Sequence, residues 1–552
     1  MCDPTTTTSS SSSSGSGSVV VRHSVSCEAT LFPHVVVPSL SSLTSLLSSF
    51  LLERSKKHAL QAGRLPTSSW SDIPALRSAV EHLRLTDFPP SMPSLSFWEL
   101  SDDNVELNVY CFHASSDPPE SDDACDDGGG DADECTHTLL QLPSQLLDGS
   151  WDSLVLPEGV KSSLLSYVES ALFFSDVGVD YDVISCNRLL LLYGPPGSGK
   201  TTLCKSLANK MSIRLRHRYP SSCLLEINAH SLFSKWFSES GKKVSSLFAY
   251  IHETCLDDPE NLVFVLVDEV ESLVGSRSSA IGTGEPGDSL RAVNAVLTGL
   301  DRLRRLPNVV VLTTTNMHGA SASTTATTTT SSALDGAFLD RADVKLYVGN
   351  PTAPAAYDIL RSCVAELLRA GVLRESDVDE TESSSSSSSP PPPEGGPTNK
   401  NKHKSKCCNL ADAYEAAKRR ALSEARTNTT TTGGEGGGST TNGTTQAHTP
   451  QRRPTPDMAD CAFLQPEQQP PPPPSDKGKA GEHGLLVAAA ECAADLQMSG
   501  RALRKAPFIC YSKAFGATGS GRGRKVVGLM DFLLAMKRHI AEIATQERAE
   551  KA

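Results

Sequence analysis

The sequence has no long hydrophobic run, and this absence limits where the protein is expected to work. No apolar stretch among its 552 residues approaches the length of about 20 residues that a transmembrane helix needs. The first residues, MCDPTTTTSSSSSS, contain neither a basic nor an apolar segment and do not resemble a secretory signal. We therefore expect a soluble protein without a membrane span that works inside the cell.

A basic charge balance and paired cysteines are also missing. The net charge is −13, which disfavours nucleic acid as a direct partner, because neutralising phosphates needs a basic face. The fifteen cysteines form no C-x-x-C pair, and this indicates reduced thiols in the cytosol or nucleus. Cys407 and Cys408 lie near His403, which leaves a metal site open; two unligated thiols in a low-complexity tract are the simpler interpretation.

The hydrophobic share is only 38%, and the shortfall lies in polar tracts rather than throughout the chain. These tracts are too polar to bury a core, so we predict that they are disordered. A run of lysines between residues 400 and 406 leaves two interpretations open, a nuclear-import signal or a solvated linker. The tracts are the tail 1–18, the Ser/Thr/Ala segment 320–332, and inserts at about 375–408 and 427–482.

The segments between these tracts predict three folded domains. Residues 19–145 predict a small mixed α/β domain, with a helix at Ser45–Ala59 and a half-buried strand near Val105–Cys111. An acidic stretch at 117–134 interrupts it and is either a surface insertion or an attraction site for a basic partner. The other segments are a linker at 146–187 with a helix at Val160–Phe174, an α/β core at 188–350, and a small helical domain at 351–552.

The core predicts a parallel sheet, because strand signals alternate with helical ones. A parallel sheet is covered by helices on both faces and binds ligands at the carboxyl ends of its strands. A strong helical pattern covers Ser289–Leu303. The strands are predicted at Leu189–Leu192, Leu224–Ile227, Val263–Val267, Val309–Thr313 and Val344–Val348, and the small domain's helices at Ala353–Leu368, Leu410–Arg426, Gly484–Gln497 and Val526–Gln546.

The first of these strands runs directly into GPPGSGKT, which has the phosphate-loop spacing G-x-x-x-x-G-K-[ST]. Glycines let backbone N–H groups approach phosphates, and the following helix points its N-terminal dipole at the same anion. We expect Lys200 to reach the β- and γ-phosphates and the Thr201 hydroxyl to bind Mg²⁺. A chance glycine-rich turn is the alternative, which the flanking signals disfavour. The predicted nucleotide-binding residues are Gly194, Pro195, Pro196, Gly197, Ser198, Gly199, Lys200, Thr201 and Thr202.

Polar residues at the ends of the later strands complete a hydrolytic site. Asp268 is predicted to help hold Mg²⁺ and Glu269 to polarise the attacking water as general base; two acids ending a strand in solvent are the alternative. Asn316 follows a neighbouring strand and is a candidate to orient the same water. Arg341 precedes the last strand and suits the charge that develops on a transferring phosphoryl group.

In this order, GPPGSGKT, VFVLVDE, TTTN and DRAD resemble an AAA+ ATPase. The longer words EINAHSLFSKWFSESGK, LVDEVESLVGSRSSAIGTGEPGDSLRAVNAVLTGLD and SGRALRKAPF are similar to the pachytene checkpoint protein 2 family, also called the thyroid-receptor-interacting ATPases. The resemblance is strong over about 150–373 and 494–545 and weak over 19–145. It implies an AAA+ fold in which the N-terminal domain binds a substrate or an adaptor.

The resemblance also assigns roles to residues. It implies that Arg341 is offered to a neighbouring subunit, that Arg501 is the second sensor, and that Asn316 is the first. Trp236 and Phe237 match the first pore loop, where aromatic rings grip a peptide without sequence demands; ordinary core aromatics are the alternative. The implied cofactors are ATP and Mg²⁺.

In functional terms, the resemblance implies a homo-hexamer that converts HORMA-domain proteins from a closed to an open form, with a HORMA-type adaptor as a further partner. It implies action in meiotic checkpoint control and in spindle checkpoint silencing, in the nucleus and also in the cytoplasm and at kinetochores. Two alternatives stay open, a general AAA+ unfoldase or microtubule-severing motor, and a nucleotide-gated scaffold that does not hydrolyse ATP.

Overall fold

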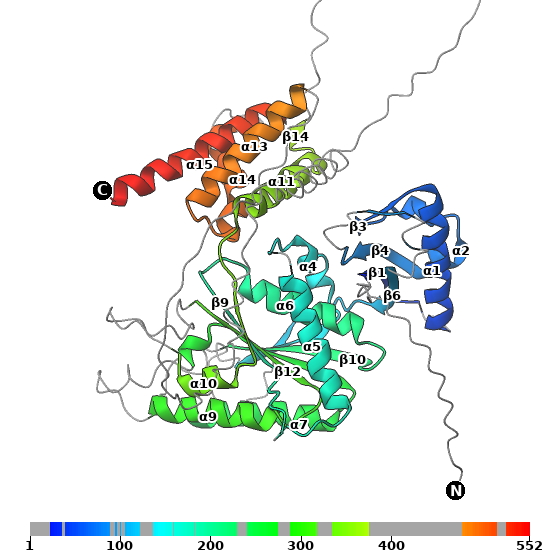
Figure 1. Ribbon diagram of the computed structural model, residues 1–552, viewed down its shortest axis with the longest axis vertical. Helices are drawn as coiled ribbons and strands as arrows, with labels where there is room; N and C mark the ends of the chain where they lie inside the picture. Colours follow the sequence, from blue (N-terminus) through cyan, green and yellow to red (C-terminus); the bar gives the residue numbers. More distant parts are fainter. Residues whose placement is uncertain are drawn as a thin grey trace, which may run out of the picture. The chain divides into compact units, whose positions relative to one another are not determined.

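The chain divides into two compact units in the computed structural model (Figure 1). The first unit contains residues 1–118, 141–148 and 209–220, and the second contains the rest. The predicted helix at Leu410–Arg426, both long inserts and the aromatic pair Trp236–Phe237 lie outside the residues that the structure describes. The described residues are 23–35, 39–88, 94–96, 100, 105–121, 136–157, 159–181, 183–228, 240–273, 288–316, 334–374, 477–515 and 526–551.

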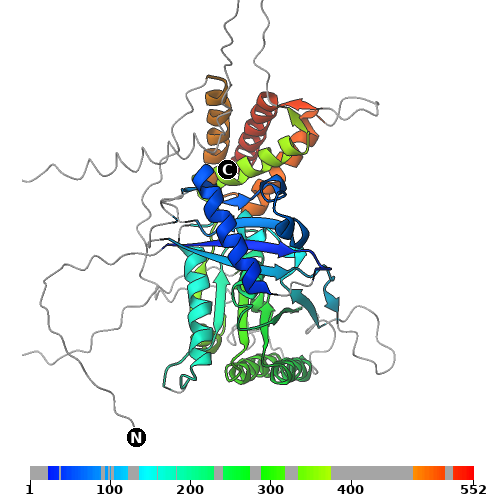
Figure 2. The ribbon, with the colours of Figure 1, turned by 90° about the vertical axis from the view of Figure 1, so that its right-hand side faces the viewer.

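A four-stranded sheet with the order β3-β4-β1-β6 forms the centre of the first unit. Strand β1 (His23–Leu31) is antiparallel to β4 (Val80–Thr86) and parallel to β6 (Val105–His113). Figure 2 shows helix α1 (Leu40–Lys57) lying across one face of this sheet. Short elements complete the unit: β2 (Leu60–Gln61), β3 (Gly63–Arg64), η1 (Thr67–Ser69), α2 (Pro74–Ala79), β5 (Ser94–Leu95) and η2 (Gln145–Leu147).

A seven-stranded sheet with the order β13-β9-β12-β11-β10-β8-β7 forms the centre of the second unit. The strands from β9 to β13 take the order fifth, first, fourth, third, second, and the neighbouring pairs among them are parallel. Strand β7 pairs antiparallel with β8. The bounds are β7 (Glu120–Ser121), β8 (His137–Leu142), β9 (Leu189–Tyr193), β10 (Ser221–Ile227), β11 (Asn261–Val267), β12 (Val309–Thr315) and β13 (Val344–Tyr347).

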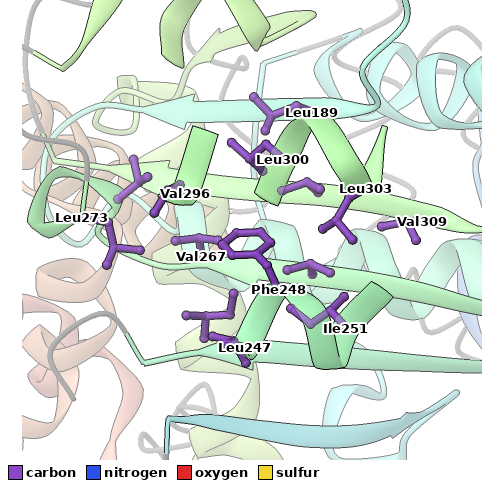
Figure 3. Close-up of a cluster of buried hydrophobic side chains, with 14 of the residues drawn as sticks. Leu189, Leu247, Phe248, Ile251, Val267, Leu273, Val296, Leu300, Leu303 and Val309 are labelled. Carbon is purple, nitrogen blue, oxygen red and sulfur yellow. The ribbon is translucent and has the colours of Figure 1, made fainter. Parts of the chain in front are cut away.

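Helices cover both faces of this sheet (Figure 1). On one face, α7 (Ser240–Asp257) and α9 (Asp288–Leu303) pack over alternate strand residues in a cluster that includes Phe248 and Leu300 (Figure 3). The two helices approach closely because a Cβ at Gly299 would lie only 2.3 Å from the Phe248 ring. The remaining helical elements of this core are α4 (Ser150–Ser153), α5 (Val160–Asp176), α6 (Lys200–Arg214), η3 (Val270–Ser272) and α10 (Gly336–Arg341).

Four helices and a two-residue strand pair form the C-terminal part of the second unit. Their apolar side chains, including Leu360, Phe532 and Met536, make one buried cluster. The cluster uses the apolar stripe predicted near the C-terminus as its packing face. The elements are α11 (Ala353–Arg369), β14 (Leu373–Arg374), α13 (Lys477–Asp495), α14 (Gly500–Phe515), β15 (Val527–Gly528) and α15 (Leu529–Lys551).

The predicted α/β class, with a helix-covered sheet and a C-terminal helical part, is confirmed. The structure differs from the expected boundaries in two places. Strands β7 and β8 join the seven-stranded sheet although their residues were assigned to the N-terminal domain, because strand pairing over long distances leaves no local signal. Helix α13 begins at Lys477, inside the stretch expected to be disordered, because a polar helical turn lacks the apolar periodicity that reveals a helix.

Two absences concern the described part of the chain. Within these ranges, no helix combines the length and the apolar character that a membrane span requires. Every cysteine in the same ranges carries a free thiol. Cys407 and Cys408, for which the sequence left a metal site open, lie outside them.

Candidate functional site

The phosphate loop connects the end of β9 to the first turn of α6, and its backbone can be built only with glycine. Gly194 has φ +148°, and a Cβ there would lie 2.2 Å from the carbonyl oxygen of Val348. Gly197 has φ +76°, and its Cβ would lie 2.9 Å from the hydroxyl of Ser499. Both positions therefore need a residue without a side chain, for reasons of backbone angle and of space. The resulting loop is a concave surface at the N-terminus of α6, where an anion is favoured.

Lys200 is the first residue of α6, and only 5% of its surface is exposed. Its ammonium group donates to the carbonyls of Gly194 (2.9 Å) and Pro195 (2.8 Å) and to the Asn316 side-chain oxygen (2.9 Å). Burial lowers the pKa of Lys200, and the carboxylates of Glu271, Asp268 and Glu269 oppose this shift. The lysine is thus desolvated and held by neutral acceptors, which phosphate oxygens can replace.

Thr201 and Asp268 come together as the sequence predicted for a metal pair. The Thr201 hydroxyl donates to Asp268 Oδ1 over 2.8 Å. The hydroxyl of Thr314, which is buried at the end of β12, donates to the same carboxylate oxygen. Hydroxyl and carboxylate oxygens are the ligands that Mg²⁺ prefers, so these side chains have the right chemistry to hold it.

Glu269 is held in an unusual backbone conformation, with φ 52° and ψ 52°. Left-handed angles cost free energy for a residue other than glycine, and such residues cluster at functional sites. The backbone N–H of Glu269 donates to the Thr314 hydroxyl over 3.1 Å. Its carboxylate accepts from the Asn316 amide nitrogen at 3.4 Å. The candidate general base and the candidate first sensor are therefore in contact.

Thr314 is a site residue that the sequence reasoning missed. It connects Asp268 and Glu269 by accepting from one and donating to the other. The word TTTN contained the signal, but only its asparagine was singled out. A hydroxyl two residues before Asn316 in an extended strand lies on the same side as that asparagine, and this alternation would have identified it.

Arg341 lies at the end of α10 and is paired within its own subunit. Its guanidinium donates two bonds of 2.8 Å to the carboxylate of Asp301 and one of 2.7 Å to the Ala337 carbonyl. The hydrogen bond from Arg341 lowers the pKa of Asp301. These contacts are separate from those of Lys200, as a residue offered to a neighbouring subunit requires. The role itself stays a prediction.

Arg501 lies in the first turn of α14, and its backbone N–H donates to the Gly197 carbonyl over 3.1 Å. Its Cβ would be 3.3 Å from a Cβ at Gly197. The structure therefore places the candidate second sensor against the phosphate loop. Of the other loop residues, Pro196 and Thr202 are exposed, and the buried Ser198 hydroxyl has no hydrogen-bond partner among the described residues. Trp236 and Phe237 lie outside the described part, so their pore-loop role stays a prediction.

Comparison with known proteins agrees with this geometry. Residues 190–350 match the family model described as "ATPase family associated with various cellular activities (AAA)". That family implies that the loop binds a nucleotide. The glycine cradle, the buried lysine and the hydroxyl–carboxylate pair fit such a ligand and its metal ion.

Individual relatives are similar to this chain over a longer region. The pachytene checkpoint protein 2 homolog of Oryza sativa subsp. indica is 46% identical over 306 residues, which are 55% of this chain and 60% of the relative. The homolog of Arabidopsis thaliana is 47% identical over 279 residues, 50% of this chain and 55% of the relative. The chain thus spans little more than half the length of these relatives. The structure of C. elegans PCH-2 matches with a TM-score of 0.59 and 26% identity, over 95% of this chain and 100% of that one.

Proposed function

Since the chain carries an AAA ATPase domain similar to that of the pachytene checkpoint protein 2 homologues, we propose that it hydrolyses ATP to remodel other proteins. The observation that carries this proposal is a continuous set of hydrogen bonds around one cleavage site. Thr201, Asp268, Thr314 and Glu269 form one part of it, and Lys200 joins through Asn316. A phosphate-binding lysine, a metal pair and a base are the parts that phosphoryl transfer to water requires.

In this proposal each residue has one task. Lys200 exchanges its three neutral acceptors for phosphate oxygens, and Thr201 and Asp268 hold Mg²⁺. The bound Mg²⁺ neutralises charge on the transferring phosphoryl group. The Glu269 carboxylate takes a proton from the attacking water, which the Asn316 amide orients. Arg501 contacts the nucleotide from the small helical domain.

The oligomer is a homo-hexamer in this proposal, because Arg341 serves a site that is not its own. Within one subunit Arg341 is paired with Asp301, and assembly exchanges this partner for the charge that develops in the neighbour's site. Trp236 and Phe237 of the subunits then grip the polypeptide substrate. We further propose that this substrate is a HORMA-domain protein, presented alone or with a HORMA-type adaptor, and that the protein acts in the nucleus at meiotic chromosomes and in the cytoplasm and at kinetochores in spindle checkpoint silencing.

The test combines two assays on the purified full chain. ATP hydrolysis is measured for wild type, Lys200→Ala and Glu269→Gln, and conversion of a closed HORMA-domain protein to its open form is followed with each. Hydrolysis and conversion that both vanish in the two variants support the proposal. Nucleotide binding without hydrolysis in the wild type would instead identify a scaffold. Hydrolysis without HORMA conversion would leave a general unfoldase or a severing motor.

A further inference from the structure

Glu271 is a third carboxylate beside the candidate site, two residues after Glu269 in the 3₁₀ turn η3. Its Oε1 accepts the backbone N–H of Asn316 over 3.1 Å. Asn316 is the first residue beyond strand β12, so at this point a side chain supplies the acceptor that a neighbouring strand supplies earlier. The bond ties the end of β12 to the turn that follows β11.

The side chain of Asn316 lies between two residues of the chemistry. Its oxygen accepts from Lys200 at 2.9 Å, and its nitrogen donates toward Glu269 at 3.4 Å. A side-chain amide can keep both contacts only while its own backbone stays fixed, because it has two rotatable bonds. Glu271 holds that backbone, so it acts on both contacts through one hydrogen bond.

The second carboxylate oxygen of Glu271 shows that packing is not the whole reason for this residue. Oε2 is buried and accepts no hydrogen bond from the described residues. An unpaired buried carboxylate oxygen is destabilising, and a glutamine or a smaller residue would avoid that cost. The negative charge is offset by the Lys200 ammonium group, whose pKa Glu271 raises against the effect of burial. The charge is thus placed where the phosphate-binding lysine needs it.

We infer that Glu271 is a positioning residue for ATP hydrolysis, which fixes the Asn316 backbone so that the Asn316 amide stays between Lys200 and Glu269. This inference rests on the proposed ATPase activity. It assigns Glu271 no contact with the nucleotide. Loss of the residue is therefore expected to slow turnover more than it weakens ATP binding, because a misplaced orienting group affects the reacting geometry.

The main experiment compares kcat and KM for ATP in the full-length protein and three variants. Glu271→Ala removes the acceptor, Glu271→Gln keeps an oxygen that can accept from Asn316 and removes the charge, and Glu253→Ala changes an exposed glutamate of α7 as a control. We expect Glu271→Ala to lower kcat about tenfold or more with KM changed less than about threefold. Glu271→Gln is expected to recover most of the rate, and Glu253→Ala to match the wild type.

A double-mutant cycle with Asn316→Ala tests the route of the effect. If Glu271 acts through Asn316, adding Glu271→Ala to Asn316→Ala lowers kcat by less than about twofold, because coupled residues are not additive. Full additivity would overturn the inference. So would a Glu271→Ala variant with wild-type kcat, one whose only change is a higher KM, or a Glu271→Gln variant as slow as the alanine variant.

Failure of the inference is distinguishable from failure of the proposed function. A wild-type protein that releases phosphate, with no release from Lys200→Ala or Glu269→Gln, establishes the activity before Glu271 is considered. Absence of release from the wild type overturns the proposed function, and the inference with it. Melting temperatures of all variants show whether a lower rate reflects unfolded protein; an alanine variant that is slow only in proportion to its unfolded fraction would overturn the inference as well.

Discussion

Helix α6 carries a buried lysine near each of its ends, and the two differ in the partners they have. Lys200 begins the helix and donates to two backbone carbonyls and one amide oxygen, all of them neutral. Lys210 lies ten residues later, in the part of α6 that belongs to the first unit. It pairs there with the carboxylates of Glu28 and Asp87 and donates to the Thr86 hydroxyl. Both lysines are buried, with 5% and 3% of their surfaces exposed.

This comparison shows how the same side chain serves binding in one place and structure in another. Neutral acceptors leave the charge of Lys200 without a fixed counterion, so a phosphate can take that place. The carboxylates around Lys210 neutralise it permanently. Burial alone would raise the pKa of Asp87, but Lys210 and Arg214 outweigh that effect and hold the pKa well below its ordinary value. An ion pair of this kind is costly to break and offers no vacancy for a ligand.

The largest expected effect is on catalysis at the first lysine. Lys200→Ala should lower ATP hydrolysis at least about 100-fold, because the charge that meets the phosphates is lost. Its unfolding free energy should change little, because only neutral acceptors lose a partner. Phosphate release and chemical denaturation measure the two quantities. An active Lys200→Ala protein would remove the functional half of the comparison.

At the second lysine we expect the opposite pattern. Lys210→Met leaves two buried carboxylates without their cation and should lower the unfolding free energy by about 3–5 kcal/mol. Adding Glu28→Gln should recover part of the loss, because one of the unpaired charges is then absent. Urea titrations of the single and double variants measure both effects. A loss below about 1 kcal/mol would show that Lys210 is not the structural residue described here.

The third expectation concerns pH and the same ionic cluster. The folded pKa of Asp87 lies below the unfolded value of about 3.9. Its stabilisation is therefore fully present above that value and is lost as the pH falls through it toward the folded pKa. The contribution is about 2 kcal/mol. The unfolding free energy of Asp87→Asn should thus depend less steeply on pH below about 4 than that of the wild type; parallel curves would contradict the assignment.

The smallest effect is expected at Lys205, between the two. Lys205 pairs with Glu226 at 2.7 Å, and both side chains are about one-third exposed (29% and 33%). Such a pair contributes about 0–1 kcal/mol. Lys205→Ala should therefore keep nearly wild-type stability and ATP hydrolysis in the two assays above. It is the matched control for both buried lysines, and a large change in either assay would show that position along α6, rather than the partners, decides the outcome.

The predictability of these residues from sequence follows from the distance to their partners. Lys200 was predicted because the glycines that shape its surroundings lie within six residues of it. Asp268 and Glu269 were predicted because a buried strand ends directly before them. The bond from Asn316 to Glu271 joins two segments separated by 45 residues, and no pattern in either segment indicates it. Lys210 likewise reads as an ordinary helix residue until its carboxylate partners are known.

The sequence by itself determined the α/β core, the phosphate loop and the chemical types at the strand ends, because strand and helix periods and glycine-dependent turns are local properties of a chain. Only the tertiary structure decided which of the lysines in α6 meets carbonyls and which meets carboxylates. It also decided that β7 and β8 extend the core sheet and that Arg341 is paired with Asp301. Each of these contacts joins residues far apart in the chain, and its free energy exists only after the strands and helices have packed.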